Sequence, residues 1–169
     1  MNQGRKRVAA IEGWFEADSK EPRLLGSKCK SCGTYFFPKE TFFCRNPNCQ
    51  GSEFEEVRLS RSGTLWSFTN NCYKPPPPYV SADPFEPYAI AAVELSKEKM
   101  VVLGQVVRGV DTSELRLGMD MELVLETLYQ DDDNEYVIWK WKPAAHQASL
   151  RQSSVGREPT NRPPGGDTR

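Results

Sequence analysis

Four cysteines between residues 29 and 49 form two closely spaced pairs. They are Cys29-x2-Cys32 and Cys44-x4-Cys49, and Gly33 directly follows the first pair. Two such pairs, each able to close a turn around one ion, supply the four thiolates of a tetrahedral metal site. Because four thiolates leave no open position for water or substrate, the ion would stabilise the fold rather than activate a reactant. The spacing therefore predicts one structural zinc ion, bound by Cys29, Cys32, Cys44 and Cys49.

Disulfides and iron are the alternatives for these thiols. An odd total of five cysteines and the lack of an export signal disfavour disulfides. Iron in a rubredoxin-type site also takes four thiolates. The second pair, however, encloses an Asn-Pro-Asn insert instead of repeating the Cys-x2-Cys-Gly turn. Zinc is favoured, and a rubredoxin-like electron carrier stays open as an alternative.

Few other residues of the chain could support catalysis. Its single histidine, His146, lies in a polar stretch, so the base that a serine or cysteine nucleophile needs has no plausible scaffold. Cys72 is interpreted as a buried free thiol, and Asp131–Asn134 as a turn rather than a carboxylate cluster. We expect the chain to catalyse nothing on its own.

The charge and hydropathy of the 169-residue chain restrict the classes of partner that it can bind. Its 22 basic and 23 acidic residues give a net charge of −1, which argues against a nucleic-acid partner. No run approaches the roughly 18 apolar residues of a membrane helix, and the first residues lack a secretory h-region and cleavage site. We expect a cytoplasmic protein without a membrane partner.

The chain divides into an N-terminal helix, a zinc ribbon and a barrel, which together must position the predicted metal site and any surface that binds a partner. Residues 1–20 are predicted to contain an amphipathic helix, because apolar side chains recur there with helical spacing and Pro22 follows. Residues 21–57 hold the paired cysteines and only short apolar runs such as Phe42-Phe43, so this zinc ribbon needs its ion to fold. The apolar positions of the helix are Val8, Ile11, Trp14 and Phe15.

Residues 58–142 change to period-two alternation and β-forming residues. Five strands are predicted, and Asp111 caps a one-turn helix between the third and fourth. This is the layout of an OB-fold, a small Greek-key barrel. Residues 143–169 are polar and are predicted to be a disordered tail. The predicted strands are Gly63–Tyr73, Pro87–Leu95, Met100–Arg108, Asp120–Gln130 and Glu135–Lys142. The expected fold is thus mainly β with an N-terminal helix, a rubredoxin-like zinc ribbon and a five-stranded OB-fold barrel.

The order of the motifs resembles a known family. The first cysteine pair is followed by an aromatic-proline step, and the barrel region carries three further matching runs. This combination is similar to the zinc-ribbon plus OB-fold proteins, long carried as a domain of unknown function, that accompany thiolase-like enzymes. The resemblance covers roughly residues 8–142. The aromatic-proline step is Phe36-Phe37-Pro38, and the three runs are Ser62–Thr69 (SGTLWSFT), Pro87–Ala91 (PYAIA) and Leu117–Leu123 (LGMDMEL).

The resemblance implies a non-catalytic accessory subunit of a hetero-oligomer. Its partner would be a thiolase or retro-aldolase acting on acyl-CoA thioesters, in steroid side-chain or aromatic-acid degradation, and acyl-CoA would be met mainly through that partner. No catalytic residue carries over, because in this family the chemistry resides on the partner. The alternative from another class is a single-stranded nucleic-acid binder, since OB barrels commonly present stacking aromatic residues.

A loop rich in proline and aromatic residues separates the first two predicted strands. Proline stiffens such a loop and lowers the ordering cost of binding, which suits recognition. The same aromatic residues could instead cap the barrel, as those of the N-terminal segment could cover the ribbon. The expected partner-binding residues are Trp14, Phe15, Pro75, Pro76, Pro77, Pro78, Tyr79, Phe85 and Tyr88.

Overall fold

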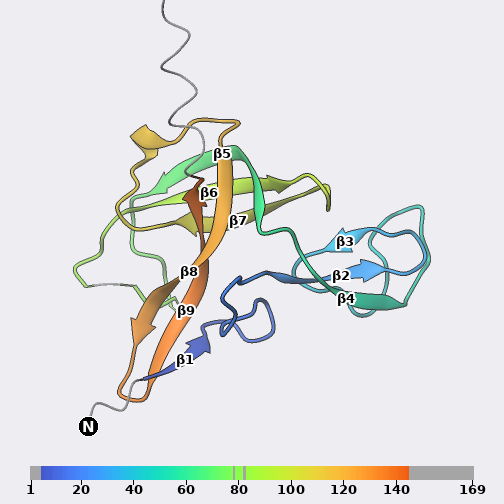
Figure 1. The fold of residues 1–169 in the computed structure, drawn as a ribbon, viewed down its shortest axis with the longest axis horizontal. Helices are drawn as coiled ribbons and strands as arrows, with labels where there is room; N and C mark the ends of the chain where they lie inside the picture. The colour runs from blue at the N-terminus through green and yellow to red at the C-terminus, as the bar shows by residue number, and fades with distance from the viewer. Residues whose placement is uncertain (1–4, 78, 82, 145–169) are drawn as a thin grey trace, which may run out of the picture.

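The computed structural model describes residues 5–77, 79–81 and 83–144, whose regular elements are β-strands apart from one short helical turn. Figure 1 shows a small ribbon sheet to one side of a larger barrel. The predicted zinc ribbon followed by a closed five-stranded barrel is confirmed. Among the described residues there is no α-helix, and no helix long and apolar enough to cross a membrane.

Five strands close the barrel in the order β5-β6-β7-β9-β8, with β8 returning to β5. Among the pairs of these five strands, only β7–β9 is parallel. This pairing is the Greek-key barrel of the OB-fold. Residues at matched register fill the interior in layers, one of which joins Leu65, Val93 and Val102. The strands are β5 (Ser62–Asn71), β6 (Tyr88–Leu95), β7 (Met100–Val106), β8 (Asp120–Gln130) and β9 (Asn134–Pro143).

The two connections with predicted local structure are as expected. The helical turn η1 (Thr112–Glu114) begins at Asp111, whose side chain accepts from Ser113 N, while the Glu114 side chain accepts from Asp111 N. This reciprocal capping box satisfies donors that a short helix leaves free. Between β8 and β9, the Asp131 carboxylate accepts from the backbone of Asp133 and Asn134 and closes the turn.

The ribbon is a three-stranded antiparallel sheet in the order β3-β2-β4. A short linker joins it to the barrel, and the buried Glu98 of the β6–β7 turn holds that linker: Ser60 N and Ser60 Oγ both donate to Glu98 Oε1, at 2.9 and 3.0 Å. The linker is therefore fixed rather than free. The ribbon strands are β2 (Leu25–Cys29), β3 (Tyr35–Phe36) and β4 (Phe54–Arg58).

The predicted N-terminal helix is wrong. Residues Lys6–Ala9 form strand β1, which pairs in parallel with the first half of β9, and Ala10 N extends the pairing to Val137 O at 2.8 Å. Gly13 then takes a left-handed conformation, with φ of 75°, and turns the chain. A helix this short is marginal in water, whereas the open edge of β9 supplies ready backbone partners.

Aromatic side chains join the N-terminal segment, the ribbon and the barrel into one core. The Trp139 ring of β9 lies 6.0 Å from Trp14, 5.6 Å from Phe15 and 5.9 Å from Phe37, measured between ring centroids. Trp14 and Phe37 also meet edge to face at 5.5 Å. Because the rings come from three different parts of the chain, this cluster fixes how the ribbon sits against the barrel.

We expect Phe15→Ala to lower the free energy of unfolding by about 3 kcal/mol or more, because it removes a ring that is only 4% exposed from this junction. Urea denaturation measures the loss. Tyr73→Ala is the matched control, since Tyr73 is 70% exposed and its truncation should cost less than about 0.5 kcal/mol. A loss below 1 kcal/mol for Phe15→Ala would show that the cluster does not hold the parts together.

Candidate metal centre and partner-binding residues

Four thiols meet at one end of the ribbon. The Sγ atoms of Cys29, Cys32, Cys44 and Cys49 all lie within 4.8 Å of one another. Two of the separations are 3.8 Å, between Cys29 and Cys49, and 3.5 Å, between Cys32 and Cys44. A tetrahedral ion with Zn–S bonds of about 2.3 Å requires sulfur atoms about 3.8 Å apart. The donor set and its dimensions therefore fit one zinc ion.

Two glycines allow the chain to turn tightly around these thiols. Gly33 adopts φ of 74°, in the left-handed region that favours glycine, and its N–H donates to Cys29 O at 2.9 Å. Gly51 N donates to Cys49 Sγ at 3.3 Å. A Cβ atom at Gly51 would lie 2.6 Å from Ser31 Oγ and 3.0 Å from Cys29 Sγ, so the backbone approaches the cluster too closely for a side chain.

The thiols differ in acidity without a metal. Hydrogen bonds from the side chain and backbone of Thr34 lower the pKa of Cys32 to about 6. The backbone N–H of Cys32 lowers the pKa of Cys29. Burial raises the pKa of Cys44 to about 12. Because zinc binds thiolates, the ion must displace at least the proton of Cys44.

The metal centre is structural. Four thiolates complete a tetrahedral shell and leave no position for a reactant, so the ion's contribution is to hold the ribbon together. The predicted structural zinc is confirmed by the family description of this segment, given below, together with the clustered thiols.

The remaining cysteine gives no sign of activation. Cys72 directly follows β5 and is exposed, so the interpretation of a buried thiol is wrong. Its Sγ contacts the Asn70 carbonyl at 3.9 Å. The lone histidine, His146, lies outside the described residues, as do residues 145–169 of the predicted tail.

The loop between β5 and β6 folds back over one end of the barrel. Tyr79 stacks on Tyr88 with ring centroids 6.5 Å apart, Phe85 meets Tyr88 edge to face at 6.1 Å, and Gln105 Nε2 donates to Tyr79 Oη. Burial, followed by the hydrogen bond with Tyr79, raises the pKa of Tyr88 to about 12. These contacts half-bury all three rings.

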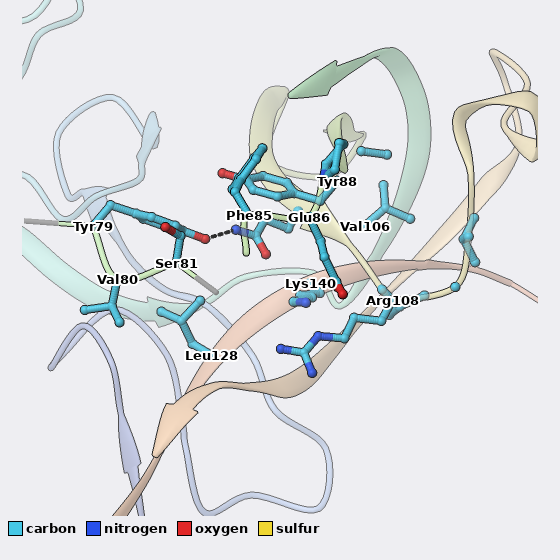
Figure 2. Close-up of a pocket in the computed structure, with 16 residues that line it drawn as sticks. Tyr79, Val80, Ser81, Phe85, Glu86, Tyr88, Val106, Arg108, Leu128 and Lys140 are labelled. Carbon is cyan, nitrogen blue, oxygen red and sulfur yellow. Dashed lines mark hydrogen bonds between the residues drawn. The ribbon is translucent and has the colours of Figure 1, made fainter. Parts of the chain in front are cut away.

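A cavity of about 200 Å³ lies beneath this loop. Figure 2 shows the loop residues Tyr79 and Phe85 above it, and Arg108 and Lys140 on the barrel side. The buried Lys140 is not free to bind an anion, because its Nζ pairs with Glu126 Oε2 at 2.9 Å. The loop aromatics thus cap the barrel while keeping part of their surface exposed.

The other predicted partner residues differ in exposure. Phe15 is buried in the core and Trp14 is half-buried in the junction cluster, so little of either ring can reach a partner. Pro76 and Pro77 are exposed and Pro75 is half-buried, while Pro78 lies outside the described residues.

Sequence reasoning missed several exposed apolar side chains. Trp66, 63% exposed, sits at a bulge where β5 shifts register between Leu65 and Ser67, and Leu103 of β7 is also 63% exposed. Strand periodicity alone could not place Trp66 outside, because a bulge reverses the alternation of side chains. Phe42 and Phe43 of the ribbon, 80% and 65% exposed, were visible in the sequence only as a short apolar run.

Comparison with known proteins identifies the family. Residues 20–55 match the description "ChsH2, rubredoxin-like zinc ribbon domain" and residues 56–126 match "ChsH2, C-terminal OB-fold domain". A DUF35 domain-containing scaffold protein of Methanocaldococcus jannaschii is 32% identical over 70% of this chain and 79% of its own length. The chain belongs to the ChsH2-type zinc-ribbon and OB-fold family. The resemblance inferred from the sequence motifs is confirmed.

Other members of the ChsH2-type family bear more specific names. The benzoylsuccinyl-CoA thiolase subunit BbsA of Geobacter metallireducens is 35% identical over 76% of this chain and 80% of its own length. A solved structure titled "Ltp2-ChsH2(DUF35) aldolase" covers 80% of this chain and 98% of the matched chain, with a TM-score of 0.56 and 24% identity. At that identity the structure shows a shared fold.

We expect Cys32→Ser to reduce bound zinc from one equivalent to less than half an equivalent and to unfold the ribbon, because metal binding supplies the folding energy of such a segment. Metal analysis and circular dichroism measure the two effects. Cys72→Ser is the matched control, because Cys72 lies outside the thiol cluster, and this variant should keep one zinc. A folded Cys32→Ser ribbon without zinc would contradict the structural role of the ion.

We expect zinc affinity to rise with pH between 6 and 8. The pKa of Cys44 is raised to about 12 and that of Cys49 is also raised, so both thiols are protonated in the metal-free protein and zinc must compete with their protons. Competition titrations with a chelator of known pH dependence measure the affinity. An affinity that is unchanged or falls over this range would contradict the assigned ligands.

Proposed function

We propose that this protein is a non-catalytic subunit that binds and supports a thiolase-like enzyme, a thiolase or retro-aldolase, acting on acyl-CoA thioesters. The observation that carries the proposal is the 35% identity to a thiolase subunit over 76% of this chain. A relative with that name and the same two-part architecture makes an enzyme partner the simplest role for this chain.

The geometry supports a role without chemistry of its own. The thiol cluster is closed around its ion, so it offers no position where water or substrate could bind. Cys72 is exposed, and its Sγ contacts a backbone carbonyl rather than a base. Nucleophilic catalysis needs a nucleophile activated by a neighbouring group. The reaction is therefore assigned to the partner, which also supplies the main acyl-CoA contacts.

The proposed pathway draws on the two named relatives and on the family resemblance. One relative is a subunit of a benzoylsuccinyl-CoA thiolase and the other belongs to an aldolase. The first name suggests degradation of aromatic acids for this chain, and the resemblance of its sequence motifs implies degradation of steroid side chains as the other setting. We place the complex in the cytoplasm, because four of the five cysteines form a metal-binding cluster rather than disulfides and Cys72 is a free thiol, as expected in a reducing compartment.

Charge pairing favours this role over single-stranded nucleic-acid binding. OB barrels that bind single strands combine stacking aromatic residues with a positive groove. Here Lys140 pairs with Glu126 at 2.9 Å, and Arg61 pairs with Glu122 at 2.5 Å. These cations are already neutralised by their own barrel, which removes the attraction to phosphates.

The ribbon favours this role over electron transfer. Cys44 and Cys49 are separated by four residues, and the turn is closed by Cys49 N donating to Asn46 O at 2.9 Å. This departs from the Cys-x2-Cys-Gly turn that the first pair forms. Purified protein distinguishes the alternatives by eye, since ferric tetrathiolate is strongly coloured and zinc is colourless.

Co-expression with the thiolase-like enzyme of the same organism tests the proposal. We expect the two proteins to co-elute, the enzyme to lose solubility or activity without this chain, and the isolated chain to turn over no acyl-CoA. Size-exclusion chromatography and thiolysis or retro-aldol assays measure these outcomes. Absence of co-elution, or turnover by the isolated chain that is lost in Cys72→Ser, would refute the proposal.

A further inference from the structure

Two consecutive phenylalanines project from the ribbon. Phe42 is 80% exposed and Phe43 is 65% exposed. Single apolar residues on a surface are ordinary, but adjacent large rings with this exposure mark interaction sites. Both belong to the loop between β3 and β4, away from the proline-rich loop that the sequence singled out (Figure 1). The metal centre does not use these rings.

A buried carboxylate fixes the start of this loop. Glu40 is only 6% exposed, and its Oε1 accepts from Thr41 N at 3.0 Å and from Phe42 N at 3.3 Å, while its Oε2 accepts from Arg45 Nε. The backbone N–H of Phe42 is the main cause that lowers the pKa of Glu40, so the group stays ionised at neutral pH. The backbone of Glu40 is held in turn by Ser27 Oγ, at 2.8 and 2.9 Å.

The metal centre fixes the end of the same loop. Cys44 directly follows Phe43, is buried, and donates its N–H to Gly51 O at 2.8 Å. Its Sγ lies 3.5 Å from Cys32 Sγ within the thiol cluster. The two rings therefore stand between two anchored residues, Glu40 and Cys44. A side chain presented from a fixed backbone loses less entropy on binding, which favours affinity.

The charged side chains of the ribbon indicate the kind of partner. All four basic residues between positions 28 and 45 form ion pairs within the ribbon: Lys28 with Glu55, Lys30 with Glu53, Lys39 with Glu56, and Arg45 with Glu40. Stacking of nucleic-acid bases on aromatic rings is accompanied by free positive charge that tracks the phosphates. A neutralised surface with two projecting rings fits instead an uncharged, apolar pocket of a protein.

We propose that Phe42 and Phe43 form an anchor that inserts into an apolar pocket on the enzyme subunit, and that zinc holds this anchor in its binding position. This proposal rests on the function proposed above, and it names the surface by which the chain binds the enzyme. Large aromatic side chains buried at the centre of an interface dominate its binding energy. The ribbon is then the element that docks, and its ion is required for docking as well as for folding.

The experiment compares the affinity of the purified enzyme for wild-type chain, for the double variant Phe42→Ser/Phe43→Ser, and for Leu117→Ser, by calorimetry. Leu117 is the matched control, because it is 67% exposed but lies on the barrel. We expect the double variant to bind at least about 100-fold more weakly and the control to bind within about threefold of wild type. Both variants should keep one zinc, because none of the three substituted residues is a ligand.

A third variant, Phe42→Leu/Phe43→Leu, keeps apolar side chains on the loop and should recover most of the affinity. Binding of Phe42→Ser/Phe43→Ser within about threefold of wild type, or an equal loss in Leu117→Ser, would overturn the anchor while leaving the accessory function intact. Failure of the wild-type chain to bind the enzyme would refute both. Binding of a single-stranded oligonucleotide that is lost in the double variant would overturn the assignment of a protein pocket.

Discussion

Coordination of one ion by four thiolates is the constraint on which the rest of this structure depends. The thiols lie within 4.8 Å of one another, and without a cation they could not all ionise, as the pKa of about 12 for Cys44 shows. The ribbon around them has one small three-stranded sheet, and segments of this size need a bound metal or a similar cross-link to fold. Zinc therefore determines whether the ribbon folds. The surface of the folded ribbon depends on the ion for the same reason.

The barrel and the ribbon depend on each other through a shared core. Phe37 of the ribbon packs on Trp139 of the barrel, and Glu98 of the barrel holds Ser60 in the linker. Strand β1 closes the arrangement by pairing with the edge of β9. The ribbon is thus held in a defined position relative to the barrel. The docking role that we propose for the ribbon requires such a fixed position.

Local signals in the sequence were sufficient where the structure is locally determined. The cysteine spacing predicts the metal site, and the period-two alternation predicts the barrel, because each depends on neighbours in the chain. The structure of the N-terminal segment does not depend on its neighbours in the chain. Val8, Trp14 and Phe15 fit a helical stripe, but the chain follows an edge of β9 more than 120 residues away, for example Val8 beside Tyr136. A sequence pattern read over a few neighbouring residues cannot reveal this strand pairing.

The surface was the least predictable part. The exposure of Trp66 follows from a bulge, and that of Cys72 from where β5 ends, and neither leaves a clear mark in the sequence. The proline-rich loop was recognised, although its rings Tyr79 and Tyr88 stack on each other. The Phe42-Phe43 run was visible, but only the contacts of Glu40 reveal that the pair is held outward.

Native mass spectrometry of the protein isolated from its own cells under gentle conditions shows directly whether the chain is a zinc-bound subunit of an enzyme complex. We expect an assembly in which each 19.2 kDa chain carries one zinc ion and is bound to a thiolase-like enzyme subunit. A chain recovered alone, or bound to nucleic acid, with its zinc in place would contradict it.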